Sequence, residues 1–330
     1  MWLFTIIKKK KIYYIENVYS DIKIKNLDEF YNSVIERFNL FEDYENIRLP
    51  EEFTYKINKN LVKSNTSKKK FKSLVKKAKK YISRGDIFQV VLSQRFERKL
   101  EKRPLEIYNY LRKSNPSPFM FYFNYKDFNV LGSSPEILVR LRKNQVTIRP
   151  IAGTRPRGKN QKEDKKYELD LLKDKKELAE HLMLLDLGRN DVGKVVEINS
   201  VKVTEKFKVE KYSHVMHIVS NVIGKFNNKF SLFETLLSGF PAGTVSGAPK
   251  IRAMEIIDEL EKNKRKLYAG GIGYFTPNNE FDTCIALRTA VIKDKKFYVQ
   301  AGAGVVADSK PEKEYAETVN KAKALMKATD

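Results

Sequence analysis

Cysteine, histidine and tryptophan are scarce in this chain, which has one cysteine, three histidines and one tryptophan in 330 residues. The single cysteine, Cys284, excludes an internal disulfide and a metal cluster built on thiolates, and it suits a reducing cytoplasm. All three histidines lie between residues 181 and 217, without partners at the spacing of a zinc motif. Disulfide scaffolds and structural zinc proteins are therefore excluded.

Long apolar runs, internal repeats and Pro/Gly/Ser-rich linkers are also missing. No apolar stretch approaches the ~20 residues that span a bilayer, so we expect no membrane partner. The apolar start MWLFTII is followed, not preceded, by lysines, which makes it a poor signal peptide. We expect it to pair as a β-strand with IYYIENV. No glycine-flanked serine or cysteine nucleophile is present, which excludes a hydrolytic triad.

Acidic residues are the minority among charged side chains, with 41 Asp+Glu against 64 Lys+Arg and a formal net charge of +23. Such an excess is typical of proteins that bind nucleic acids. However, lysine outnumbers arginine about threefold and is spread along the whole chain, whereas base recognition relies on arginine forks. We therefore expect no nucleic-acid partner, and we keep a basic binding protein without catalytic activity as an alternative.

The order of predicted elements favours an α+β fold. Strand-like runs such as IFQVVLSQRF, FMFYFNY and FDTCIALRTAVI form blocks apart from the helical runs, which indicates largely antiparallel sheets. We expect helices over 27–38, from residue 71 to Gly85, over about 162–187, after Pro249 and near the end of the chain. Residues 1–57 are expected to form strands and a helix, 58–70 a loose connection, and 71–330 the main domain.

Two helical segments repeat one carboxylate pattern. Glu177 and Glu180, and again Glu314 and Glu317, are three residues apart and so share a helix face. Four carboxylates from two helices suit a Mg²⁺ ion that retains water and binds an anionic substrate. Spacing alone nevertheless favours an ordinary solvated face, on which Lys321 pairs with Glu317.

Other candidate motifs stay open or fail. His217 in YSHVMH is either a structural histidine or an acid–base group, and the sequence does not decide between them. GFPAGTVSGAPK lacks P-loop spacing, and AGAGVVA at 301–307 is not followed by a complete βαβ unit. What remains is a stretch of unobstructed backbone N–H groups that suits a small anion. Cys284, in an apolar strand, is expected to be an inert thiol.

Ten segments, taken together and in order, resemble the chorismate-utilising enzymes, and most closely their anthranilate synthase large subunits. The resemblance covers nearly everything from about residue 71 onward and implies two packed, mostly antiparallel sheets flanked by helices. With this resemblance, we interpret the four glutamates as a Mg²⁺ site and no longer as an ordinary solvated helix face. The segments are GDIFQVVLSQRF, NPSPFMFYF, GSSPEILVR, RPIAGTRPRG, ELAEHLMLLDLGRND, YSHVMH, GTVSGAPKIRAMEII, YAGGIGYF, DTCIALRTA and QAGAGVVADSKPEKEYAETVNKA.

The resemblance implies a site for Mg²⁺ and chorismate. Glu180 and Glu317 resemble direct Mg²⁺ ligands, and Glu177 and Glu314 support the ion through water. The ring carboxylate is expected on the metal, on Thr244 and on the backbone of Gly302, Ala303 and Gly304. Tyr268 and Arg288 are expected to bind the enolpyruvyl carboxylate, Lys321 to add positive charge, and His217 to donate a proton to the leaving ring hydroxyl.

Two positions distinguish members of the family. Relatives that form isochorismate or salicylate carry a water-activating lysine where this chain has Gln89, which cannot deprotonate water, so ammonia is the expected nucleophile. Relatives that form aminodeoxychorismate often carry lysine where this chain has Ala152. The resemblance thus implies anthranilate synthesis, the first committed step toward tryptophan, with aminodeoxychorismate synthesis as the alternative. Ammonia is expected from a separate glutamine amidotransferase subunit (component II) in a hetero-oligomer.

The chain departs from the family at its start, because the region with an LLES-type segment is absent from this sequence. That region carries strands of the family's sheet sandwich and half of a tryptophan feedback pocket, so we expect exposed strand edges and weak tryptophan inhibition. A separately encoded piece, a truncated gene and a degenerate enzyme all fit the sequence. The other half of the pocket matches Asn115, Pro116, Ser117, Met120, Tyr274 and Cys284.

Overall fold

The structure is a computed structural model that describes residues 3–8, 11–16, 26–45, 62–212 and 215–329. The chain divides into two compact units, residues 1–58 and 59–330, and each is described by itself. In the first unit, β1 (Leu3–Lys8) and β2 (Lys11–Glu16) pair antiparallel, which confirms the expected strand pair. Helix α1 (Leu27–Glu45) extends beyond the predicted end at residue 38. The rest of segment 1–57 lies outside the described residues.

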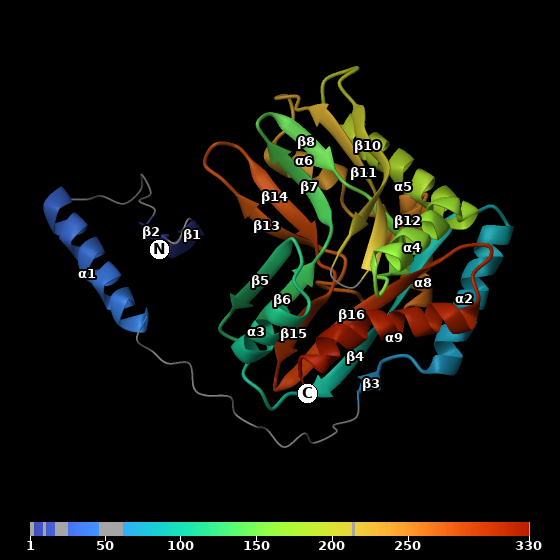
Figure 1. The fold of residues 1–330 in the computed structure, drawn as a ribbon, viewed down its shortest axis with the longest axis horizontal. Helices are drawn as coiled ribbons and strands as arrows, with labels where there is room; N and C mark the ends of the chain where they lie inside the picture. Colours follow the sequence, from blue (N-terminus) through green and yellow to red (C-terminus); the bar gives the residue numbers. More distant parts are fainter. Residues whose placement is uncertain (1–2, 9–10, 17–25, 46–61, 213–214, 330) are drawn as a thin grey trace. The chain divides into compact units, whose positions relative to one another are not determined.

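The second unit is built on two seven-stranded sheets in which every pairing is antiparallel, which confirms the expected fold class (Figure 1). The first sheet has the order β12-β4-β16-β15-β6-β5, with β3 also paired to β4. Its strands are β3 (Lys63–Ser64), β4 (Gln89–Lys99), β5 (Phe119–Asn124), β6 (Asn129–Ser134), β12 (Gly247–Ala248), β15 (Thr289–Lys293) and β16 (Lys296–Val305).

The second sheet has the order β10-β11-β8-β7-β14-β13, and β9 also pairs with β11. Its strands are β7 (Ile137–Arg142), β8 (Gln145–Ile148), β9 (Ile151–Pro156), β10 (Lys202–Lys211), β11 (Val215–Lys225), β13 (Gly271–Phe275) and β14 (Phe281–Ile285).

Two of the places where the chain passes from one sheet to the other are short direct links, and they lie next to each other. It passes from β6 to β7 through Pro135–Glu136, and from β14 to β15 through 286–288. The Ser133 amide donates to the Arg288 carbonyl (3.1 Å), and the Ile285 amide donates to the Glu136 carbonyl (3.0 Å). The continuous strand-like runs NVLGSSPEILVRL and FDTCIALRTAVI are therefore each divided between the sheets, and each crossing places a charged side chain beside the other.

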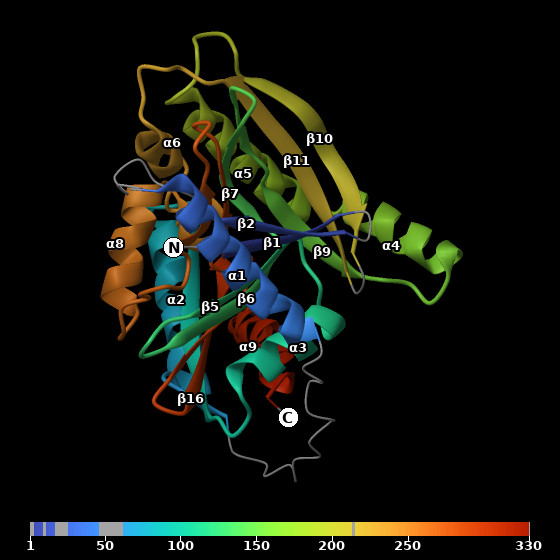
Figure 2. The ribbon, with the colours of Figure 1, turned by 90° about the vertical axis from the view of Figure 1, so that its left-hand side faces the viewer.

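Helices cover the sheets on separate sides. Against the first sheet lie α2 (Lys68–Ser83), α3 (Pro104–Ser114), α8 (Lys250–Leu260) and α9 (Pro311–Lys327), and against the second lie α4 (Gln161–Lys173), α5 (Lys175–Gly193) and α6 (Leu232–Ser238) (Figure 2). The short α7 (Gly243–Ser246) precedes β12. Buried Phe71 and Val75 of α2 pack with Val90 of β4 and Ile256 of α8 in one core cluster. Among the described residues, no helix is both long and apolar enough to cross a bilayer.

Two predicted boundaries differ from the structure. The single helix expected over 162–187 is wrong, because α4 ends at Lys173 and α5 begins at Lys175. Asp174 between them is extended, and its carboxylate accepts from the amides of Lys176 (3.0 Å) and Glu177 (3.2 Å), which caps α5. Helix α2 starts at Lys68, inside the segment 58–70, because Ser67 caps it.

Candidate active site

The glycine stretch of β16 is where the expected site residues from three elements meet. A Cβ atom at Gly304 would lie 2.5 Å from Gln89 Nε2 and 3.5 Å from Glu180 Oε1. A Cβ atom at Gly302 would lie 2.7 Å from the Tyr268 hydroxyl. A side chain at either position would displace these groups from the strand. The AGAG sequence therefore brings β4, α5 and the loop before β13 together around one strand.

The backbone of this stretch has one strand neighbour. Gly302, Ala303 and Gly304 pair with β4, whereas β15 pairs with β16 only as far as Val299. Beyond Val299 the other edge of β16 has no strand partner in the described part of the chain, as an anion-binding backbone requires. On this stretch, Lys321 of α9 donates to the Gly302 carbonyl at 3.1 Å.

The four glutamates come from α5 and α9 as expected. The pKa values of Glu177, Glu180 and Glu314 are raised, first by burial and then by neighbouring carboxylates, which include Glu317 in each case. Gln89 Nε2 donates to Glu180 (2.7 Å), and cationic side chains lie beside two of the others: Lys321 Nζ is 2.7 Å from Glu317, and Arg155 Nη1 is 3.8 Å from Glu177.

These carboxylates fit a hydrated Mg²⁺ better than a fully protein-coordinated metal. Within the described residues, no three His, Cys, Asp or Glu side chains are close enough to hold an ion between them. Mg²⁺ typically takes one or two carboxylates and keeps its other positions for water and substrate oxygen. The mutual repulsion that raises three of the glutamate pKa values marks a concentration of negative charge that such a cation would relieve.

Glu136, at the first crossing, is a site residue that the sequence analysis missed. Its side chain is buried, and burial raises its pKa to about 8, although Thr244, Lys321 and Arg288 favour the ionised form. At neutral pH the carboxyl group is therefore mostly protonated and able to donate. The only sequence signal was its place in the motif GSSPE, directly after a strand and a proline.

Arg288, at the second crossing, faces Glu136 without forming an ion pair in the described part of the chain. Burial lowers the pKa of this guanidinium, and Glu136 and Tyr212 oppose that shift. Its φ of 46° is uncommon for a non-glycine residue and holds the crossing in a tight bend. A half-buried arginine that forms no ion pair among the described residues is suited to bind a carboxylate.

His217 lies on β11, between β10 and β9 of the second sheet. In the sheet it lies opposite Glu210 of β10 on one side and Thr154 of β9 on the other. Its Nδ1 atom is 2.9 Å from the Gly153 carbonyl and 3.1 Å from the Thr154 hydroxyl. Since a carbonyl only accepts, the contacts assign a proton to Nδ1 and leave Nε2 free. Burial lowers the pKa of His217, so the ring is neutral near pH 7. His214 lies outside the described residues.

Three polar groups around the glycine stretch can still form a hydrogen bond to a ligand. Gln89 Oε1 and the Thr244 hydroxyl are both buried and have no hydrogen-bond partner of normal geometry among the described residues. Burial also raises the pKa of Tyr268, whose ring lies 5.4 Å from the Arg265 guanidinium, so its hydroxyl remains a donor. An acceptor, a hydroxyl and a phenol thus remain available around the glycine stretch for a polar ligand.

The residues matched to a feedback pocket come from both sheets. Met120 lies on β5, and Asn115 precedes that strand; its buried Nδ2 atom has no hydrogen-bond partner among the described residues. Cys284 is buried on β14, where burial raises the pKa of its thiol to about 11, so it is inert. Tyr274 on β13 is half exposed and accepts from Arg142 (2.7 Å). Pro116 and Ser117 lie between α3 and β5.

Comparison with known proteins identifies the family. The profile described as chorismate binding enzyme matches residues 8–327. Anthranilate synthase component 1 of Cereibacter sphaeroides is 62% identical over 269 residues, which are 82% of this chain and 54% of that protein. The corresponding protein of Aquifex aeolicus is 56% identical over 268 residues, 81% of this chain and 54% of that protein.

A crystal structure of anthranilate synthase component I from Streptococcus pneumoniae superimposes with a TM-score of 0.84 at 42% identity, over 96% of this chain and 70% of that one. The chain spans about half the length of the curated relatives that it matches. The family resemblance of the sequence motifs is thereby confirmed. Because the profile covers nearly the whole chain and both relatives are more than half identical to it, the chain belongs to the chorismate binding enzyme family.

Proposed function

We propose that this chain carries the catalytic site of an anthranilate synthase component I. Ammonia adds to the chorismate ring, the ring hydroxyl leaves as water, and loss of a ring proton then expels pyruvate and gives anthranilate. One chorismate and one ammonia thus become one anthranilate, one pyruvate and one water. The observation that carries the proposal is the neutral amide of Gln89, buried beside Glu180 with a free acceptor oxygen, at the position where water-using relatives are expected to have a base.

Substrate binding is assigned to the groups left without partners. Arg288 and the Tyr268 hydroxyl would bind the enolpyruvyl carboxylate, a role that suits a fixed guanidinium fork. The Thr244 hydroxyl and the free edge of Gly302–Gly304 would bind the ring carboxylate. Glu180 and Glu317 would hold Mg²⁺ directly, with Glu177 and Glu314 acting through water. The ion would neutralise the ring carboxylate and fix its orientation.

Gln89 determines the nucleophile. Its Nε2 atom is committed to Glu180, so the unpartnered Oε1 atom is the one that can accept from a nitrogen donor. Ammonia supplies such donors and needs no general base to attack. Water would need a base, and a neutral amide does not provide one.

The two proton transfers are divided between Glu136 and His217. With a pKa of about 8, Glu136 is protonated at neutral pH and can donate to the departing hydroxyl. We propose it for this role in place of His217, because the lowered pKa of His217 leaves its Nε2 atom unprotonated. That atom is suited to accept the ring proton whose loss expels pyruvate.

Partners and location follow from the chemistry. The hydrolysis of glutamine requires a nucleophile that the sequence lacks, so ammonia would come from a component II amidotransferase subunit in a hetero-oligomer within the cytoplasm. The alternative product, 4-amino-4-deoxychorismate, would mean that this chain adds ammonia but does not catalyse the elimination of pyruvate. Liquid chromatography of a reaction of the purified chain with chorismate, Mg²⁺ and ammonium distinguishes the products. We expect fluorescent anthranilate; isochorismate or 4-amino-4-deoxychorismate as the final product would refute the assignment.

A further inference from the structure

Strand β10 contains a bulge that brings two glutamates to the same face of the sheet. Side chains alternate along a regular strand, so Glu205 and Glu210, five positions apart, would point to opposite faces. In the ladder with β11, Glu205 lies opposite Asn221 and Lys208 opposite Val219, so one extra residue is inserted between them. The inserted segment contains Phe207, whose φ of 54° is costly for a non-glycine residue.

The bulge is held from the neighbouring strand and from the helix that carries Glu180. The Phe207 amide donates to the Ser220 hydroxyl of β11 (3.0 Å), in place of a ladder partner. The same hydroxyl lies 2.7 Å from Nε2 of His181, which follows Glu180 on α5. The His181 ring packs edge-on against Phe207, with centroids 5.0 Å apart. Contacts with Ser220 and His181 thus stabilise the backbone conformation at Phe207.

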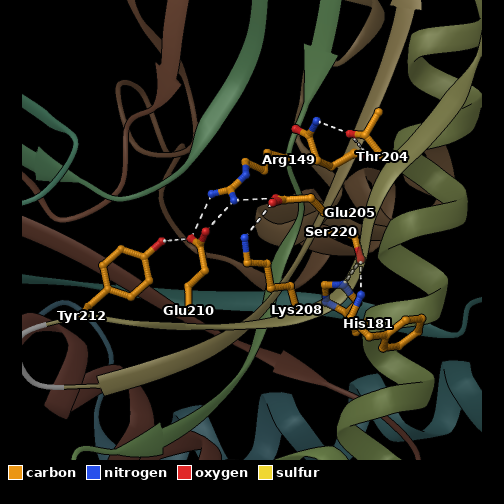
Figure 3. Close-up of polar contacts among 10 residues, drawn as sticks. Arg149, His181, Thr204, Glu205, Lys208, Glu210, Tyr212 and Ser220 are labelled. Carbon is orange, nitrogen blue, oxygen red and sulfur yellow. Dashed lines mark hydrogen bonds and ion pairs between the residues drawn. The ribbon is translucent and has the colours of Figure 1, made fainter.

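Because of the bulge, Glu205 and Glu210 can both bind Arg149, which lies in the link between β8 and β9. Its guanidinium donates to both Glu210 oxygens (2.6 and 2.9 Å) and to Glu205 (2.9 Å). The Tyr212 hydroxyl donates to the same Glu210 carboxylate at 3.0 Å (Figure 3). Arg149 holds the Glu210 carboxylate in place, and Glu210 in turn holds the hydroxyl of Tyr212. We name Arg149, Glu210 and Tyr212 the arginine clamp.

The arginine clamp ends on the ring of His217. The Tyr212 and His217 rings meet edge to face, with centroids 5.6 Å apart and an interplanar angle of 62°. Glu210 itself lies directly opposite His217 in the β10–β11 ladder. On its other side, the histidine is bound through Nδ1 to Gly153 and Thr154. The terminal torsion of a histidine is broad and twofold, so contacts on both sides of the ring are what select one orientation.

We propose that the arginine clamp is a positioning device for His217, with Tyr212 holding the imidazole in the orientation that keeps Nδ1 on Gly153 and Nε2 free. Tyr212 is a positioning residue: it acts through the histidine, without a transfer of its own. The inference deepens the proposed function, because it names what keeps the proton acceptor of the second step in its working tautomer.

The first test is spectroscopic and needs no turnover. The chain has only three histidines, so nitrogen-15 NMR of the imidazoles resolves each one, and a His217→Gln variant assigns the signal. We expect the Nδ1–H tautomer in the unaltered chain. In Tyr212→Leu, which removes both ring and hydroxyl, we expect a mixture of tautomers, and in Tyr212→Phe, which keeps the ring, a smaller change. Tyr81→Phe is the matched control, since it also removes a hydroxyl that donates to a glutamate, Glu259.

The second test is kinetic and rests on the proposed function. We expect kcat for ammonia-dependent anthranilate formation to fall about 10- to 100-fold in Tyr212→Leu, as for a misplaced catalytic group, with KM for chorismate nearly unchanged and partial recovery in Tyr212→Phe. If Tyr212→Leu does not fold, Glu210→Gln, which keeps the side-chain volume, replaces it. Folded variants with an unchanged tautomer overturn the inference. If the tautomer shifts in Tyr212→Leu but the unaltered chain forms no anthranilate, the inference about Tyr212 is supported and the proposed function is refuted.

Discussion

Glu136 and Arg288 occupy the two neighbouring crossings between the sheets, and backbone hydrogen bonds tie each crossing to the strand that leads into the other. Burial acts on both in the same sense, favouring the neutral form of each side chain. The carboxyl group responds by keeping its proton at neutral pH, whereas the guanidinium stays charged because the ordinary pKa of arginine lies far above neutrality. One pair of crossings thus presents a proton donor and an anion-binding cation side by side.

Replacement of the proton donor should abolish most turnover. In Glu136→Gln we expect kcat to fall by about 10²- to 10⁴-fold, the usual contribution of a general acid. Thermal unfolding should be little changed, because the group is already neutral in the native state. Glu197→Gln is the control, since Glu197 forms an exposed ion pair with Lys225 (2.9 Å). Equal rates in the two variants would remove Glu136 from the mechanism.

The pH profile should be bell-shaped, with limits on either side of neutrality. Glu136 must be protonated, so kcat/KM should decline as the pH rises above about 8. His217 must be neutral, and because its pKa is lowered, the acid limit should lie below pH 6.5. Stopped assays of anthranilate between pH 5 and 9.5, with the concentration of uncharged ammonia held constant, measure both limbs. An activity that rises continuously to pH 9.5 is the result that this assignment does not allow.

The nucleophile site should respond separately from the substrate site. Gln89→Leu removes the acceptor oxygen that is expected to bind ammonia, so the KM for ammonium should rise about tenfold, the value of roughly one hydrogen bond of 1–1.5 kcal/mol. The KM for chorismate should stay nearly constant. Arg288→Lys, which loses the guanidinium fork, should raise the KM for chorismate and leave the KM for ammonium nearly constant. Parallel changes of both constants in both variants would contradict this division.

His181 should make the protein less stable in mild acid. Burial lowers its pKa to about 4, against 6.5 when unfolded, so the stability conferred by the neutral ring is present above pH 6.5 and is lost as the pH falls toward 4. Between pH 8 and pH 5 the loss should be about 2 kcal/mol, measured by chemical denaturation. His181→Gln should be less stable at pH 8 but show a shallower pH slope. An identical slope would assign the acid sensitivity to other groups.

Regular periodicity was sufficient to predict most elements of the main domain. Runs of β-branched and aromatic residues identified β4, β5 and β16, and apolar residues at helical spacing identified α2 and α8. The break at Asp174 was missed because the carboxylates and apolar residues on its two sides continue a helical pattern, while a cap depends on local dihedral angles. The crossings at Pro135 and Arg288 were missed because both halves of each run have the composition of a strand.

The candidate site was predictable only where chemistry coincides with a motif. The glutamates of α5 and α9 share spacing, and the glycines of β16 form a recognisable run. Glu136 has neither feature. Its pKa is raised by burial alone, and that burial results from the packing of segments that are far apart in the sequence. The arginine clamp was also invisible, because it depends on a bulge that changes the face on which Glu210 lies.

The most direct test of the account is the incorporation of nitrogen-15 from ammonium. The purified chain is incubated with chorismate, Mg²⁺ and labelled ammonium, and the products are analysed by mass spectrometry, with a parallel assay of pyruvate. We predict anthranilate one mass unit heavier than the unlabelled compound, formed with an equal amount of pyruvate and absent when ammonium is omitted. Formation of isochorismate from water, or of a labelled amine without pyruvate, would contradict the account.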